Sequence, residues 1–184
     1  MTDIKPAAVL SAVTAVVSAL LITAHNLTWR DTSAELGDTL REKCTELMGE
    51  GEYSVVTFPD GEKPEGVYKV IEGGGSTAFE VITKGYNKDG LDLLIAFDGE
   101  GKVKGVAVVA ISETPGLGTN VNDSAFLSLF DGISDNVSIV KKTPSSQNEI
   151  EAVSGATYSS KGVANAVNIA LSAYRQMKGG TQGE

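Results

Sequence analysis

The chain contains almost none of the residues that bind redox metals or form disulfides. Among 184 residues there is one cysteine, Cys44, and one histidine, His25. A single cysteine cannot form an internal disulfide, and the pair falls short of the ligand sets that zinc and iron–sulfur sites use. The sequence therefore argues against haem, zinc and iron–sulfur roles, and no metal site is expected. If this chain moves electrons, it needs an organic cofactor.

Basic residues are also scarce. The chain has 15 Lys and Arg against 24 Asp and Glu, which gives a formal net charge of -9. Nucleic acids and anionic lipid surfaces both attract basic faces, so neither is an expected partner of the charged surface. Hydrophobic residues make up 41% of the chain, which suffices for a folded core. The length fits one domain plus a modest extra segment.

The extra segment is an uncharged run from Pro6 to Ala24. As a helix it would be about 28 Å long, close to the ~30 Å hydrocarbon core of a bilayer. Trp29 follows, where an interfacial aromatic residue would lie. The alternative is a cleaved signal peptide, but Lys5 is the only basic side chain before the run, and Ile22-Thr23-Ala24 is a poor cleavage site. We therefore predict a single transmembrane anchor within residues 1–30.

The charges that flank this run do not settle its orientation. Lys5 precedes it, whereas Arg30, Arg41 and Lys43 follow it, which slightly opposes an outside C-terminal domain. Long domains translocate largely regardless of loop charge, so the side of the membrane stays open at this point.

Residues 31–178 are expected to form one α+β domain with a mostly antiparallel sheet and helices packed on it, followed by a flexible tail, 179–184. A capping-box pattern at residues 32–35 predicts a helix that ends near residues 49–51. The other predicted elements are strands at 53–58, 67–71, 79–83, 91–97, 103–111 and 137–140, a hairpin turn at 98–101, a short helical piece at 123–130 and a long helix at 160–177.

Two loops have compositions that suit ligand binding. The first, residues 113–120 with sequence ETPGLGTN, follows an apolar strand and has glycines at alternate positions. Such glycines allow backbone amides to approach a ligand, and Leu117 could lie on a planar ring while Glu113 and Thr114 face its polar edges. The alternative is a rigid turn that connects a strand to a helix.

The second loop, residues 154–162 with sequence SGATYSSKG, opens the long helix. Small residues and hydroxyls at a helix N-terminus favour a phosphate, because the first N–H groups and the helix dipole point toward it. The pattern is not a Walker loop, since GxxxxGK[ST] is absent. A Ser N-cap with a glycine turn is the plain alternative. Together the two loops suggest one shared site.

SGATYSSKGV, with SETPGLGTN some forty residues earlier, resembles the FMN-binding domain family of bacterial respiratory complexes. With the anchor, the similarity is greatest to the G subunits of Rnf complexes, which are ion-translocating ferredoxin:NAD+ oxidoreductases. The C subunits of sodium-pumping quinone reductases are the near alternative. The resemblance covers essentially the whole chain.

The resemblance implies that an ApbE-type flavin transferase attaches FMN through a phosphoester to the threonine of SGAT, which is Thr157. The neighbouring candidates for phosphate contacts are Ser154, Gly155, Ala156, Ser159 and Ser160. The ETPGLG segment would line the flavin ring, which gives Glu113, Thr114, Gly116, Leu117 and Gly118. Tyr86, after Gly85, is the candidate for the aromatic residue that the family places against the flavin. The family usually has Asp three residues before SGAT, whereas this chain has Glu151.

The implied function is that of an electron-transfer subunit in the inner membrane, with one span and an extracytoplasmic flavin domain. Its partners would be the other membrane and iron–sulfur subunits of an Rnf complex. This chain alone would hold no complete active site and no catalytic residue, and it has neither GxGxxG nor a cysteine cluster. The alternatives are a carrier like those of quinone reductases, or a stand-alone flavinylated one, and a membrane-anchored binding module without redox activity. A hydrolase is disfavoured, because no histidine lies near the motifs.

Overall fold

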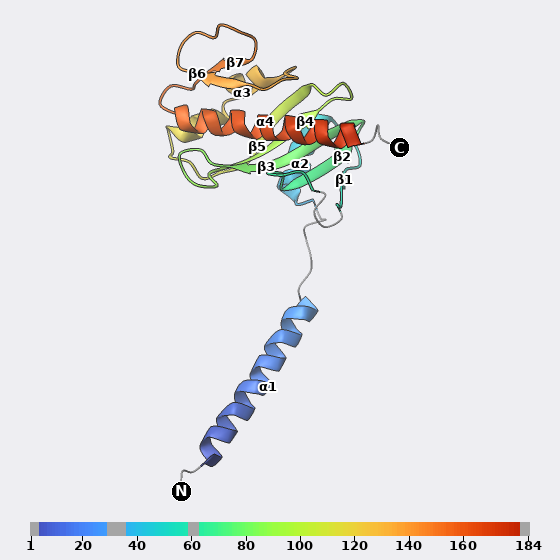
Figure 1. The fold of residues 1–184 in the computed structure, drawn as a ribbon, viewed down its shortest axis with the longest axis vertical. Coiled ribbons are helices and arrows are strands. Elements are labelled where there is room, and N and C mark those ends of the chain that lie inside the picture. The colour runs from blue at the N-terminus through green and yellow to red at the C-terminus, as the bar shows by residue number, and fades with distance from the viewer. Residues whose placement is uncertain (1–3, 29–35, 59–62, 181–184) are drawn as a thin grey trace. The chain divides into compact units, whose positions relative to one another are not determined.

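The computed structural model describes residues 4–28, 36–58 and 63–180. By internal contacts the chain divides into two units, residues 1–32 and 33–184. The predicted domain bounds, 1–30, 31–178 and 179–184, stay predictions. Figure 1 draws the elements of both units.

The first unit contains one helix, α1 (Ile4–Thr28), which covers the predicted apolar run. Its described side chains, at positions 8–24, are all exposed, and Thr14 and Thr23 donate hydrogen bonds to the carbonyls four residues earlier. Within the described part of the chain, no helix meets the length and hydropathy expected of a membrane span. The transmembrane anchor is therefore not found in the structure and stays a prediction. Trp29 lies outside the described residues.

The second unit begins with α2 (Asp38–Met48), whose Leu40, Cys44 and Met48 are buried at four-residue spacing. The predicted capping box at 32–35 lies outside the described residues. The helix ends at Gly49, which has a positive φ of 93° that L-residues rarely adopt. The predicted end of this helix is thus confirmed.

A five-stranded antiparallel sheet forms the centre of the domain. Its strands follow chain order: β1 (Ser54–Val55), β2 (Lys69–Gly73), β3 (Ser76–Thr83), β4 (Leu91–Phe97) and β5 (Val103–Ile111). The predicted bounds of β4 and β5 are confirmed, and Asp98 closes their hairpin by accepting hydrogen bonds from the backbone of Glu100 and Lys102. β1 is much shorter than predicted, because only two residues pair with β2.

The sheet is covered on both faces. α4 (Thr157–Gly180) crosses one face, and its predicted apolar side is buried there against Phe79 and Phe97. α2 covers the opposite face through Leu40 and Cys44. α4 begins three residues earlier than predicted, at Thr157, and it continues into the predicted tail as far as Gly180. Residues 181–184 lie outside the described part.

Short elements connect the sheet to α4. After β5 the chain forms a 3-10 turn (Gly118–Asn122), then α3 (Ser124–Leu127) and a second 3-10 turn (Ser128–Phe130). The last two occupy the helical piece predicted at 123–130. β6 (Ser138–Val140) pairs in parallel with β7 (Glu149–Glu151). β7 was not predicted from the sequence. The loop that leads into α4 follows β7 directly.

Two carboxyl groups lie on the sheet face that α2 covers. Glu80 on β3 is only 5% exposed, and Asp92 lies diagonally across from it on β4. One oxygen of each carboxyl is buried without a hydrogen-bond partner. Burial, and secondarily the charge of Asp92, raise the pKa of Glu80 to about 7, against an opposing effect of Lys69. Glu80 is therefore largely protonated at mildly acidic pH.

The protonated Glu80 makes stability depend on pH. Because the folded pKa lies above the unfolded value of 4.5, its contribution is fully present below about pH 4.5 and is lost as pH rises through about 7. In the wild type, the free energy of unfolding should therefore decrease between about pH 4.5 and 8, by at most about 3 kcal/mol from this residue. We expect Glu80→Gln to make this decrease smaller. Urea denaturation from pH 4.5 to 8 measures it, with Glu72→Gln, at an exposed position on β2, as the control. Equal slopes for the wild type and Glu80→Gln would contradict the prediction.

Candidate functional site

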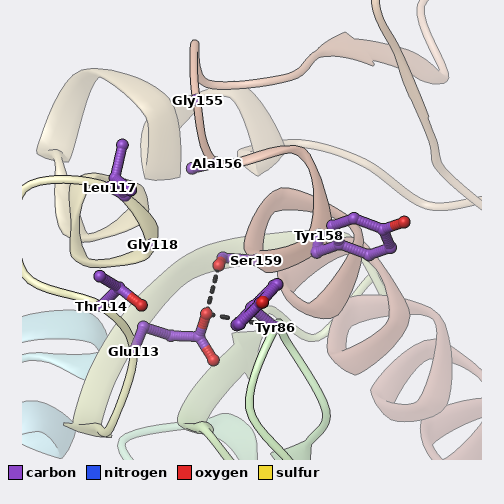
Figure 2. A pocket seen from close by; sticks show the side chains of 9 residues that line it. All are labelled: Tyr86, Glu113, Thr114, Leu117, Gly118, Gly155, Ala156, Tyr158 and Ser159. Carbon is purple, nitrogen blue, oxygen red and sulfur yellow. Dashed lines mark hydrogen bonds between the residues drawn. The ribbon is translucent and has the colours of Figure 1, made fainter.

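Three segments that are distant in the sequence enclose one pocket at the start of α4. They are the loop after β3, the loop after β5 and the loop that leads into α4 (Figure 2). The cavity measures about 320 Å³, at the lower end of the range for small-molecule sites. Its lining residues are Tyr86, Glu113, Thr114, Leu117, Gly118, Gly155, Ala156, Tyr158 and Ser159.

Glycine allows α4 to approach the end of the sheet. A Cβ atom at Gly162, on the second turn of α4, would lie 2.8 Å from the carbonyl oxygen of Lys84 and 2.6 Å from a methyl group of Leu91. Real Cβ atoms do not approach backbone that closely, so a larger residue would push the helix away from the sheet. Gly162 therefore brings the first turn of α4 next to the loop that carries Tyr86.

The loop before α4 is fixed by Ser160. Its hydroxyl accepts a hydrogen bond from the backbone N–H of Val153 (3.0 Å) and donates one to the carbonyl of Ala156 (2.9 Å). Ser160 is fully buried, so in this structure its hydroxyl serves the turn and does not face the pocket. The N–H groups of Thr157, Tyr158 and Ser159 lie in the first turn, where a helix has no internal acceptors for them.

The carboxylate of Glu113 lies at the back of the pocket. It accepts hydrogen bonds from the hydroxyl of Ser159 (2.5 Å) and from the backbone N–H groups of Tyr86 (3.1 Å) and Asn87 (3.0 Å). Burial opposes ionisation, but these three hydrogen bonds outweigh it and lower the pKa of Glu113. Figure 2 shows the carboxylate directed at Ser159 and the Tyr86 loop. Its contact with a flavin stays a prediction.

Most of the predicted site residues lie together. Eight of the twelve line the cavity: Tyr86, Glu113, Thr114, Leu117, Gly118, Gly155, Ala156 and Ser159. The remaining four, Gly116, Ser154, Thr157 and Ser160, are not part of its lining. Thr157 is nevertheless the residue between two lining residues, and its side chain is partly exposed. Its position is therefore at the edge of the pocket, on the first residue of α4.

Tyr158 was not predicted as a site residue from the sequence. The residue is 67% exposed, and its ring lies edge-on to the ring of Tyr86, with 6.2 Å between the centroids. Leu117 is 51% exposed, with one of its methyl carbons 3.2 Å from where a Cβ atom on Gly155 would lie. The sequence did contain a signal for Tyr158, because it is one large aromatic residue among small residues at the start of a helix. The cavity is thus bordered by two exposed aromatic rings and one aliphatic side chain.

The pocket lies within a region that is similar to a known family of domains. Residues 85–172 match the family model described as the FMN-binding domain. Every residue that lines the pocket falls inside this match. The fold also resembles the C subunit of the Na+-translocating NADH-quinone reductase from Parabacteroides distasonis, with a TM-score of 0.52 and 22% identity over 80% of this chain and 86% of that one. That likeness concerns the fold alone.

Curated relatives carry the resemblance further. The chain is 34% identical over 116 residues to the G subunit of the proton-translocating ferredoxin:NAD+ oxidoreductase complex of Clostridium ljungdahlii. It is 30% identical over 125 residues to the G subunit of the Na+-translocating complex of Acetobacterium woodii. These matches cover 61% and 63% of this chain, and 62% and 59% of the relatives' lengths. The resemblance to the G subunits of Rnf complexes that the motifs predicted is therefore confirmed.

The glycines around Glu113 provide a test of the pocket's packing. A Cβ atom at Gly90 would lie 2.1 Å from a carboxylate oxygen of Glu113, whose position is fixed by three hydrogen bonds. We expect Gly90→Ala to lower the free energy of unfolding by about 1–3 kcal/mol. The control is Gly99→Ala in the β4–β5 hairpin, where no atom lies within 4 Å of the added Cβ. Chemical denaturation compares them, and equal stabilities would contradict the proposed close packing.

Proposed function

We propose that this protein is the electron-transfer subunit of a membrane-bound, ion-translocating ferredoxin:NAD+ oxidoreductase and that it carries FMN covalently on Thr157. The observation that carries the proposal is the pocket at the start of α4, because all its lining residues fall within the FMN-binding domain match and two of them flank Thr157. The similarity to two G subunits supports an Rnf complex as the assembly in which this domain would work.

The residues of the pocket suit FMN. Its ring system is flat and largely apolar, which fits a cavity bordered by Tyr86, Tyr158 and Leu117. Its phosphate is an anion, which the N–H groups and dipole at the start of α4 favour. Gly155 has a φ of 75°, which lets the backbone turn sharply just before the helix. When bound, FMN would supply the reversible uptake of electrons that no side chain here provides.

Thr157 is suited to the attachment. It is the first residue of α4, so a phosphate on its hydroxyl lies within the helix's anion-binding turn. Its partly exposed side chain is reachable by a flavin transferase of the ApbE type. Glu151, where the family usually has Asp, is exposed at the end of β7 and keeps the negative charge at that position. We therefore infer that the transferase accepts this chain.

Membrane anchoring through α1 is part of the proposal. The run from Pro6 to Ala24 contains no charged residue, and the helix that includes it has exposed apolar side chains such as Leu10 and Leu20. Such a surface is stable in lipid and unfavourable in water. We infer a single span in the cell membrane, with the flavin domain on the extracytoplasmic side.

The reaction of the whole complex requires other subunits. Within the described residues there is no cluster of His, Cys, Asp and Glu that could hold a metal ion, and the sequence has no second cofactor motif. In this proposal the ferredoxin and NAD+ sites belong to partner subunits. The role of this chain is to hold FMN in a fixed position between redox partners, with no catalytic residue of its own.

Attachment is tested first. In protein purified from its native membrane, the peptide that contains Thr157 should gain the mass of one FMN less one water, and Thr157→Val should abolish the gain. Thr143→Val, at an exposed threonine between β6 and β7, is the matched control and should keep it. An unmodified Thr157 in native material, or flavin retained on Thr157→Val, would overturn the covalent assignment.

The assembly is tested by the subunits that co-purify with this protein. Recovery of iron–sulfur Rnf subunits in the same preparation supports the assembly, whereas quinone-reductase subunits would favour the alternative.

The anchor is tested separately. We expect the full chain to stay with membranes through alkaline washing and a chain without residues 1–30 to be released, because the apolar run is then missing. External protease should cleave the flavin domain in spheroplasts that contain the full chain. Protection of the domain would contradict the extracytoplasmic orientation without touching the flavin assignment.

A further inference from the structure

We propose that Glu113 is a positioning residue: its ionised carboxylate clamps the Tyr86 loop to the first turn of α4 and so holds the pocket in its binding shape before the cofactor arrives. This inference rests on the proposed function only for the identity of the ligand, FMN. The clamp itself is a property of the protein without cofactor, and it can be measured there.

The clamp joins three distant parts of the chain at one carboxylate. Glu113 follows β5, its partner Ser159 lies on α4, and its partners Tyr86 and Asn87 lie in the loop between β3 and β4. One oxygen binds both Ser159 and the N–H of Tyr86, while the other binds the N–H of Asn87. The same carboxylate therefore sets the separation between the loop and the helix (Figure 2).

Three glycines, two in the β3–β4 loop and one after β5, make room for this carboxylate. A Cβ atom would come within 2.6 Å of it at Gly85, 2.1 Å at Gly90 and 2.6 Å at Gly118. Gly118 would also meet the hydroxyl of Ser159 at 2.7 Å. None of these three glycines has the positive φ that usually explains a glycine, so close packing around Glu113 is the reason for their small size.

Only an ionised acid fits these partners. The two backbone groups are donors that cannot reverse their role, whereas the Ser159 hydroxyl can rotate. A glutamine at position 113 would point its own N–H groups at one of the backbone donors in either orientation of the amide. The three donors also lower the pKa of Glu113 despite its burial, so the charge is present at neutral pH. The clamp is thus specific for carboxylate.

The clamp acts on the residues that would hold the cofactor. Ser159 lies two positions after Thr157, and the two aromatic rings that border the cavity, Tyr86 and Tyr158, come from the two segments that Glu113 joins. If the loop moved away from α4, the gap between these rings would no longer be fixed. A pre-organised pocket of this kind binds its ligand without first ordering the loop.

Two serines on the same helical turn provide the test. Ser159 and Ser160 are both buried, but only Ser159 contacts Glu113, since Ser160 bonds to Val153 and Ala156. Hydrogen exchange is measured on the full chain in detergent, in the flavin-free Thr157→Val background. We expect Ser159→Ala to speed exchange of the Tyr86 and Asn87 amides by about ten-fold or more, and Ser160→Ala to change it by less than about two-fold.

The outcomes separate the clamp from a purely local or a general loss of stability. If Ser159→Ala changes exchange only within α4, Ser159 merely supports its helix and the clamp is wrong. If both serine variants speed hydrogen exchange in the loop equally, the effect is general destabilisation, and the clamp is likewise wrong.

Further variants test the carboxylate and the link to the cofactor. Glu113→Gln should speed exchange in the loop and at the start of α4 together. With Thr157 restored, Ser159→Ala should also slow FMN attachment relative to the wild type. A clamp seen in exchange together with no FMN attachment in any variant would uphold the clamp and refute the proposed function.

Discussion

A buried carboxylate that finds three hydrogen-bond donors determines the shape of this domain's functional end. Glu113 is 6% exposed, and its donors come from the β3–β4 loop and from α4. A charge in that position would be strongly unfavourable without them, and each donor would be unsatisfied without the charge. The local structures on both sides of the pocket are therefore mutually dependent. The glycines around the carboxylate are the steric counterpart of the same interaction.

The rest of the fold gives this arrangement a rigid support. α4 is held along the sheet by aromatic packing at the end opposite the pocket, where Tyr174 stacks on Phe97 at 5.0 Å and lies edge-on to Phe79. The hydroxyl of Tyr174 also donates to the carbonyl of Asp98 in the β4–β5 hairpin. The helix is thus fixed at both ends, by apolar contacts at its C-terminal half and by polar contacts at its start. The proposed carrier role requires a cofactor at constant distances from its partners, and such a support would provide this.

The sequence predicted the elements whose pattern is strong and local. β4 and β5 are long apolar runs separated by an Asp-Gly turn, and their predicted bounds are those of the structure. β7 is a three-residue strand that exists only through its pairing with β6, so its own residues carry no periodic signal. β1 was predicted too long because Val56 and Phe58, beyond its two paired residues, are apolar and pack against the core.

The site shows the same limit at the level of side chains. The two motifs located the pocket, because glycines and hydroxyls at a strand end and a helix start have a local physical meaning. They could not indicate where each side chain points. Glu113 accepts hydrogen bonds from groups 26, 27 and 46 residues away, which the motif that contains it does not reveal. Ser160 was expected near a phosphate, but its hydroxyl is taken up by the turn before its own helix.

Two buried glutamates, Glu80 on the sheet and Glu113 beyond its end, show what determines the direction of a pKa shift here. Glu80 and Glu113 have almost the same exposure, 5% and 6%, yet their pKa values move in opposite directions. Glu80 lies on a sheet face where one of its oxygens has no donor, so burial raises its pKa to about 7. Glu113 lies where a loop and a helix begin, and such places expose N–H groups that strands use for pairing. A stable charge is therefore possible at the end of this sheet and unfavourable on its face, which is why the polar site forms where β3, β5 and α4 meet.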